Sequence, residues 1–162
     1  MSLLRAATGL IPLVVLLLLV SVPASAQEAK VDEEPSMSPN AGPLRVFKSV
    51  ERAWLAGDAQ AIANLASGSR VYVEIRGIDR GGGHYTKPQI FYIFRNMFAS
   101  TDQMNFTFVK YFNIEKPEGR IYGMALRTYK KNQSGGLYKD KVFVTLVKEG
   151  SRWAVAEIKS TW

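Results

Sequence analysis

Four consecutive segments near the C-terminus alternate between apolar and polar residues, and this pattern restricts the fold more than any other feature of the chain. The segments are 104–114, 120–130, 137–148 and 152–160. A period of two is typical of β-strands that bury one face. Turn-forming residues, such as Pro117-Glu118-Gly119 and Glu149-Gly150-Ser151, separate them. We therefore expect a four-strand antiparallel meander.

The residues before this meander follow a helical spacing twice. The first helix is indicated by apolar residues separated by one or two helical turns, namely Leu44, Phe47 and Trp54. Gly57 is placed to end this helix. Asp58 offers its carboxylate as the N-cap of a second, short helix. The segment 70–76 then changes to period two, which predicts one further strand.

A third helix is expected directly after a glycine-rich turn at residues 77–83. Thr86 and Gln89 have the spacing of a capping box, and Ile90 can form a hydrophobic staple with Tyr85. The order is thus helix, helix, strand, helix and four strands. This order predicts an α+β domain in which three N-terminal helices pack on a mostly antiparallel sheet.

The first 26 residues have the layout of a secretory signal peptide. Arg5 precedes an apolar run of 13 residues, 10–22, and Ala24-Ser25-Ala26 provides a small-residue cleavage signature. The alternative is an uncleaved anchor helix, but the apolar run is shorter than the ~20 residues that span a bilayer. We expect cleavage after Ala26, no membrane span in the mature chain, and export to the periplasm or the extracellular space.

Residues 27–43 contain four acidic residues, three prolines and no aromatic residue, a composition that predicts a disordered leader. Residues 44–162 form the expected single domain, and they hold 19 basic and 10 acidic residues, a net charge of +9. The whole chain has no cysteine and one histidine. Thiolate chemistry and disulfides are therefore excluded, and we expect neither a metal nor a cofactor.

The late strands carry apolar side chains on both faces. Val142 and Val144 alternate with Phe143 and Val147 within one segment. One helix layer covers only one face of a sheet, and a second apolar face is typical of a partner surface. We therefore expect a homodimer that packs through the sheet face.

Two short motifs carry a resemblance to a known superfamily. They are Gly83-His84-Tyr85-Thr86-Lys87, which leads into the third helix, and Gly136-Leu137-Tyr138, which opens a late strand. Together with the order of elements over residues 44–162, they resemble the nuclear transport factor two-like superfamily, and within it small secreted bacterial domains of unknown function. The resemblance implies a curved sheet that wraps the helices into a cone, often with an apolar pocket at the open end, and frequent dimers.

The same superfamily includes isomerases, cyclases and dehydratases, in which a pocket Asp or His removes a proton. Here the expected inward positions carry no group that can accept one; they are Val71, Val73, Ile75, Phe106, Phe108, Met124, Leu126, Val142, Val144 and Leu146. Glu74 and His84 are the two weak catalytic candidates. Alternation places Glu74 opposite the core face, and His84 lies in the glycine-rich turn. An isomerase or dehydratase activity is thus an alternative to a non-catalytic role.

We expect an exported, non-catalytic domain that binds a small ligand or a protein partner. The candidates for a ligand pocket are Trp54, Tyr92, Phe108, Met124 and Arg127. Their aromatic and thioether groups suit an apolar ligand, and the arginine suits one anionic group. A second alternative is a basic surface that binds acidic envelope polymers, because lysines gather toward the ends of the expected strands. Export argues against nucleic acid as the normal partner.

Overall fold

The four expected C-terminal strands are present and pair in sequence order. They are β3 (Thr101–Phe112), β4 (Arg120–Lys131), β5 (Leu137–Glu149) and β6 (Arg152–Thr161). Each pairs antiparallel with the next, so the predicted meander is confirmed. The structure is a computed structural model, and it describes residues 42–76, 78, 81–115 and 119–161.

Two short strands extend the meander to a mixed sheet of order β2-β1-β6-β5-β4-β3. The expected strand at 70–76 is β1 (Val71–Glu74), and it pairs parallel with β6. The strand β2 (Gly83–Tyr85) was not expected from the sequence; it pairs antiparallel with β1. Its three residues pair at the end of the glycine-rich segment, where local propensity for a strand is low.

The three helices begin at the expected signals, and the first also ends at its expected glycine. They are α1 (Pro43–Ala56), α2 (Ala59–Leu65) and α3 (Lys87–Ser100). Gly57 ends α1 in the left-handed conformation with φ of 68°, and the Asp58 carboxylate accepts from the amide of Ala61 at 2.8 Å. At α3, the Gln89 side chain accepts from the Thr86 amide at 2.9 Å, as the capping box requires.

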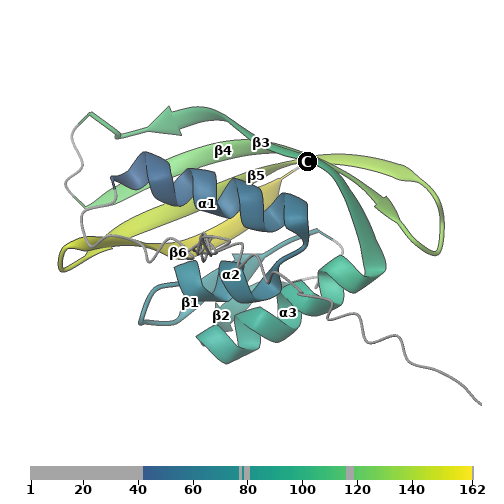
Figure 1. Ribbon diagram of the computed structural model, residues 1–162, viewed down its shortest axis with the longest axis horizontal. Helices are drawn as coiled ribbons and strands as arrows, with labels where there is room; N and C mark the ends of the chain where they lie inside the picture. The colour runs from purple at the N-terminus through teal and green to yellow at the C-terminus, as the bar shows by residue number, and fades with distance from the viewer. Residues whose placement is uncertain (1–41, 77, 79–80, 116–118, 162) are drawn as a thin grey trace, which may run out of the picture. The chain divides into compact units, whose positions relative to one another are not determined.

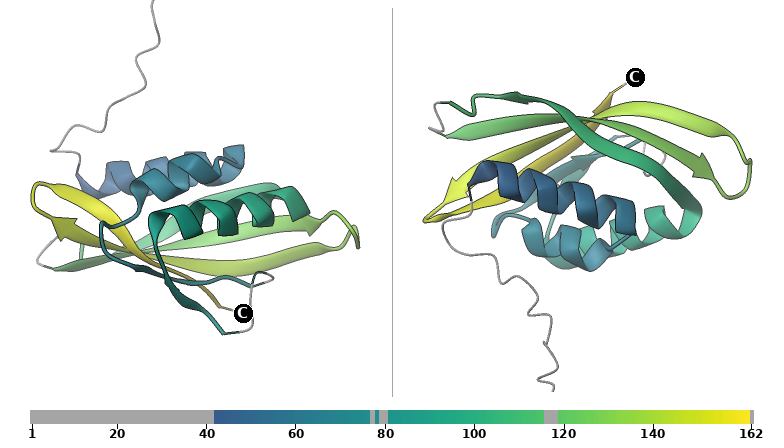
Figure 2. Two further views of the ribbon diagram at one scale, coloured as in Figure 1. Left: turned by 90° about the horizontal axis from the view of Figure 1, so that it is seen from below. Right: turned by 45° about the horizontal axis from the view of Figure 1, so that its top comes forward.

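All three helices lie on one face of the sheet, whose long strands curve around them (Figures 1 and 2). Helix α1 packs on β3, and α2 lies between α1 and α3. The side chain of Glu51 in α1 accepts from the backbone amide of Phe108, beside a register shift in β3. The α+β fold class is confirmed, with the sheet left unclosed.

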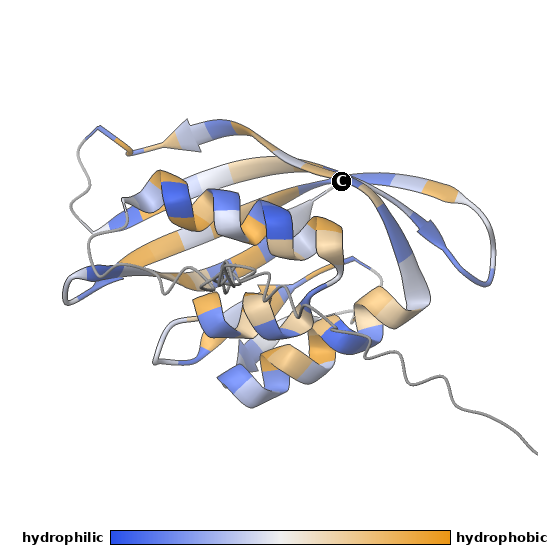
Figure 3. Cartoon of the chain, in the orientation of Figure 1, coloured by the Kyte–Doolittle hydropathy of each residue, from blue (hydrophilic) through white to orange (hydrophobic). Residues whose placement is uncertain are grey.

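The core lies between the helices and the concave face of the sheet, and the hydrophobic faces of the helices point toward it (Figure 3). Trp54 stacks on Phe106 with ring centroids 4.2 Å apart, and Phe47 lies 4.9 Å from Phe108. These rings fill the space under β4. A Cβ atom on Gly123 would lie only 2.6 Å from Cε1 of Phe47.

The inward face of β4 is the opposite of the one expected. Met124 and Leu126 point away from the helices, so their predicted inward orientation is wrong. The inward residues are Ile121, Gly123, Ala125, Arg127 and Tyr129, of which Gly123 and Ala125, in the middle of the strand, are small. The physical reason is that the aromatic rings of α1 and β3 already occupy the space that larger side chains would need.

The outer face of the sheet carries a row of half-exposed apolar side chains. Met124 lies directly opposite Phe143 on the neighbouring strand, and Tyr122 lies opposite Thr145. Leu126 is 42% exposed. Two apolar faces are thus present on the late strands, as alternation predicts.

The expected signal peptide, residues 1–26, and residues 27–41 of the expected leader lie outside the described residues, so both stay predictions. Within the part of the chain that the structure describes, no helix combines the length and the apolar character that crossing a bilayer requires.

Candidate functional site

Arg127 is the one arginine among the described residues that lies with its whole side chain buried in the core layer. The alternation of β4 turns it toward the helices, where its side chain has no exposed surface. Burying a guanidinium is costly unless polar partners surround it. The residues around Arg127 therefore form the candidate functional site.

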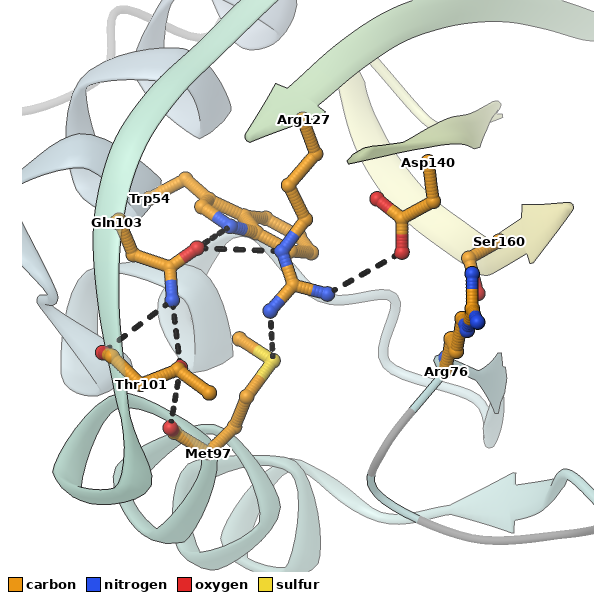
Figure 4. A network of polar contacts seen from close by, with 8 residues as sticks. All are labelled: Trp54, Arg76, Met97, Thr101, Gln103, Arg127, Asp140 and Ser160. Atoms are coloured by element: carbon orange, nitrogen blue, oxygen red, sulfur yellow. Dashed lines mark hydrogen bonds and ion pairs between the residues drawn. The ribbon is translucent and has the colours of Figure 1, made fainter. Parts of the chain in front are cut away.

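A chain of polar contacts fixes one side of the guanidinium (Figure 4). Nε of Arg127 donates to Oε1 of Gln103 at 3.2 Å, and the indole of Trp54 donates to the same oxygen at 3.0 Å. Nε2 of Gln103 in turn donates to the hydroxyl of Thr101 at 2.7 Å, and that hydroxyl donates to the carbonyl of Met97 at 2.7 Å. The network joins α1, α3, β3 and β4.

Aromatic rings cover the guanidinium. Its Cζ lies 3.8 Å from the centroid of Tyr129 and 5.6 Å from that of Trp54. Tyr129 stacks in turn on Tyr138 of β5, with centroids 5.4 Å apart and planes 21° apart. Such contacts attract a cation to the ring face, most strongly where water is excluded.

Asp140 is the counter-charge. It faces Arg127 directly across β4 and β5, and its Oδ2 lies 3.6 Å from Nη1, with both side chains fully buried. Burial raises the pKa of the Asp140 carboxyl and lowers that of the Arg127 guanidinium, while their mutual attraction opposes both shifts. Burial also raises the pKa of the Tyr129 phenol.

This cluster leaves several buried polar atoms without a hydrogen-bond partner among the described residues. They are Nη1 of Arg127, the hydroxyl of Tyr129 and both carboxylate oxygens of Asp140. Most buried polar atoms in native proteins are paired, so such exceptions concentrate at functional sites. The cluster is therefore a candidate site rather than an ordinary part of the core.

A pocket of about 420 Å³ opens beside the cluster, toward the β4–β5 hairpin and the end of α3. Its volume is in the range of sites for small organic molecules. Polar, cationic and aromatic side chains line it: Arg76, Met97, Ser100, Thr101, Arg127, Tyr129, Lys131, Gln133, Ser134 and Tyr138.

The structure brings together two of the five residues named as ligand-binding candidates. Trp54 lies against the Arg127 guanidinium and shares its hydrogen-bond partner Gln103, and of the two only Arg127 lines the pocket. Phe108 is buried against Phe47, deeper in the core. Tyr92 lies on the outer side of α3, 53% exposed and 4.8 Å from the guanidinium of Arg95, and Met124 lies on the outer sheet face.

Glu74 and His84, the two catalytic candidates, lie on the outer face of the sheet, opposite the pocket. Glu74 accepts a hydrogen bond from the Tyr72 phenol at 2.9 Å and pairs with Lys159 at 3.2 Å, and these contacts lower its pKa. His84 is exposed, with its ring 5.3 Å from that of Tyr72. His84 lines a second depression on the outer face, and Glu74 contacts Tyr72 and Lys159, which also line it.

The register also locates the expected basic residues. Lys130 and Lys131 end β4, and Lys139 and Lys141 follow the hairpin on β5, so the four lie toward one end of the sheet. Lys116, which lies between two of the expected strands in the sequence, is outside the described residues. In the described ranges, no three His, Asp or Glu side chains gather closely enough to hold a metal ion.

Sequence reasoning missed Asp140, Tyr129 and Gln103. The signal for Asp140 was present, because Val142, Val144 and Asp140 share one face of β5 by period two. Tyr129 follows Arg127 on β4 in the same way. Gln103 had no such signal, because its orientation depends on a register shift in β3 after that residue.

The sequence matches no protein-family model and no curated protein. Solved structures with a similar fold exist. A ketosteroid isomerase-like protein from Erwinia carotovora atroseptica has a TM-score of 0.59 at 11% identity, over 76% of this chain and 95% of that one. A protein of ketosteroid isomerase-like fold from Catenulispora acidiphila, solved in complex with trimethylamine, has a TM-score of 0.58 at 13% identity, over 75% of this chain and 87% of that one.

A DUF4783 family protein from Bacteroides uniformis is similar as well, with a TM-score of 0.57 at 13% identity, over 70% of this chain and 93% of that one. The chain therefore has the nuclear transport factor two-like, ketosteroid isomerase-like fold, and the expected resemblance is confirmed. At these identities the similarity shows the fold alone.

Proposed function

We propose that this chain is an exported, non-catalytic domain that binds a small ligand in the pocket above Arg127. The observation that carries the proposal is the buried guanidinium at the pocket floor, which has one conventional hydrogen bond, to Gln103, and one ion pair at 3.6 Å. A ligand that fills the pocket would give the remaining donors partners.

The walls of the pocket support this role. The stacked rings of Tyr129 and Tyr138 offer apolar contact, while Ser100 and Lys131 offer polar groups at the mouth. A concave site with a few convergent polar groups is the usual form of a small-molecule site. The trimethylamine complex of the Catenulispora acidiphila protein shows that a protein of this fold can hold a small molecule.

A non-catalytic role fits the positions of the ionisable groups. Glu74 and His84 are on the other face of the sheet from the pocket. Asp140 forms an ion pair with the guanidinium, and it does not line the pocket. A general base needs to reach the substrate proton within hydrogen-bond distance, and a carboxylate that does not line the pocket is poorly placed for that.

The test is native mass spectrometry of the mature protein, purified gently from its exporting host. We expect extra small-molecule mass on the wild type, and loss of that mass in Tyr138→Ala, which removes one wall of the pocket. Tyr92→Ala is the matched control, because Tyr92 is exposed on α3. Equal ligand occupancy in both variants would refute this location for the ligand.

The same spectrum tests export. Cleavage after Ala26 gives a mature chain that begins at Gln27. A mass that includes residues 1–26 would overturn the signal peptide.

We also propose that two copies of the chain associate through the outer sheet face. The patch of Tyr122, Met124, Leu126 and Phe143 supports this, because paired strands hold these half-exposed side chains next to one another. We expect Leu126→Glu to convert a dimer to a monomer in sedimentation velocity. Leu55→Glu on α1 is the matched control, because Leu55 is 44% exposed and Leu126 is 42% exposed. A wild-type monomer at micromolar concentration would refute this interface.

A further inference from the structure

The guanidinium of Arg127 has one contact that a ligand could readily replace. Its Nη2 points at the sulfur of Met97, 3.4 Å away, and a thioether is a weak acceptor for a cationic donor. The Met97 side chain is unbranched, so it can adopt another rotamer at low cost. Met97 and Arg127 both line the pocket. An anionic oxygen that entered the pocket would be a much stronger partner for Nη2 than sulfur.

The charges around the pocket favour a negative ligand. Three cationic residues line it, Arg76, Arg127 and Lys131, and no carboxylate among the described residues does. Asp140 forms an ion pair with Arg127 and offsets its charge. Lys131 adds a positive charge that this ion pair does not cancel, and a partly enclosed site weakens the screening of such a charge by water.

The aromatic side of the pocket indicates the shape of the ligand. Tyr138 packs with one face on Tyr129, and the ammonium of Lys131 lies 4.9 Å from the Tyr138 centroid. A planar group fits beside stacked rings with more contact area than a branched aliphatic group has. The positive field and the aromatic wall lie on the same pocket.

We propose that the ligand of this pocket is a small planar organic anion, an aromatic or conjugated carboxylate. Its acid group binds the Arg127 guanidinium in place of the Met97 sulfur, and its planar part lies against Tyr138. This proposal rests on the proposed function, since it names the class of ligand for that same site.

Three probes of similar size separate charge from shape in isothermal titration calorimetry of the full mature protein. Benzoate is planar and anionic, benzamide is planar and neutral, and cyclohexanecarboxylate is anionic and not planar. We expect benzoate to bind about tenfold or more tightly than benzamide, because a hydrogen bond to a charged partner is stronger than a neutral one. We expect cyclohexanecarboxylate to bind about threefold more weakly than benzoate.

A paired substitution tests the role of Arg127. Arg127→Met with Asp140→Leu removes the guanidinium and leaves the net charge near the pocket unchanged, because the two residues form an ion pair. We expect this variant to lose the preference for benzoate over benzamide, while Lys87→Gln, a change of one surface charge on α3, keeps it. If the paired variant retains the preference, Arg127 does not receive the acid group and the proposal fails.

If the paired variant does not fold, a crystal structure of the wild-type protein with 4-bromobenzoate gives the same answer. A carboxylate within ~3.2 Å of the Arg127 guanidinium supports the proposal, and a carboxylate bound elsewhere overturns it. Equal affinity for benzoate and benzamide, with both lost in Tyr138→Ala, overturns the anionic ligand but leaves the small-ligand pocket intact. Absence of binding by all three probes, together with bare protein in the native mass spectrum, overturns both proposals.

Discussion

Replacing Asp140 by asparagine should destabilise the protein by about 3–5 kcal/mol, because it leaves the Arg127 charge buried without its counter-charge. The magnitude follows from the geometry. The two side chains have no exposed surface, and their charged atoms lie 3.6 Å apart. At an effective dielectric constant of about 20, two unit charges at that separation attract by roughly 4–5 kcal/mol.

A double-mutant cycle isolates this interaction from other effects of each substitution. The variants are Asp140→Asn, Arg127→Met and the two combined, measured by urea unfolding with tryptophan fluorescence as the signal. Trp54 is a suitable reporter, because its ring lies 5.6 Å from the guanidinium. The double variant leaves no isolated buried charge. We therefore expect its loss in free energy of unfolding to be smaller than the sum of the two single losses, by at least about 2 kcal/mol.

An exposed ion pair is the control for this experiment. Lys48 and Glu51 lie 3.1 Å apart, closer than the buried pair, but the Lys48 side chain is 60% exposed. Lys48→Met should therefore cost no more than about 1 kcal/mol. If Asp140→Asn costs as little as Lys48→Met at an unchanged denaturant slope, the electrostatic argument for the buried pair is wrong.

Three further predictions concern the fold. Gly123→Ala should destabilise by about 1–3 kcal/mol in urea melts, because its Cβ would lie 2.6 Å from the ring of Phe47; an unchanged midpoint would contradict that packing. Thr86→Ala should cost about 1 kcal/mol in the same assay, because it disturbs the capping box of α3, and no loss would contradict this helix start. Hydrogen bonds, that from Ser67 first, lower the pKa of the Glu149 carboxyl. The ionised carboxyl therefore stabilises the fold at pH values above its ordinary pKa of about 4.5, and this contribution is lost as the pH falls through the lowered pKa of the folded state. Stability measured from pH 6 to 3 should accordingly fall less in Glu149→Gln than in the wild type, and parallel curves would count against this effect.

The elements that depend on local signals could be predicted from the sequence. The third helix begins where Thr86 and Gln89 indicate it, and the four long strands match the alternating segments to within a few residues. The strand β2 and the parallel pairing of β1 with β6 could not be predicted in this way. Both depend on contacts between distant parts of the chain, which leave no periodic pattern.

The error at β4 has a definite physical origin. Both faces of this strand carry apolar residues, so alternation alone does not say which face points inward, and Met124 and Leu126 were expected there. The other face points inward because the ring of Phe47, supplied by α1, takes the space under Gly123. Packing of this kind depends on which helix lies above the strand, and the strand's own sequence does not contain that information.

The candidate site was predictable in part. Arg127 was named as a partner for one anionic group of a ligand, and Trp54 meets it in the structure. Asp140 was not among the expected inward positions, which began on this strand at Val142. Applying strict alternation to β5 would have placed Asp140 on the same face as Val142.

The direct pairing of Arg127 with Asp140 across two neighbouring strands bears on how such a pocket could acquire a new ligand. A single substitution at either position leaves one buried charge alone, so a mutational path that changes one residue at a time passes through a destabilised protein. Libraries designed to alter the ligand charge should therefore randomise both codons together. The same coupling would keep the proposed charge preference of the pocket constant through many generations of single mutations.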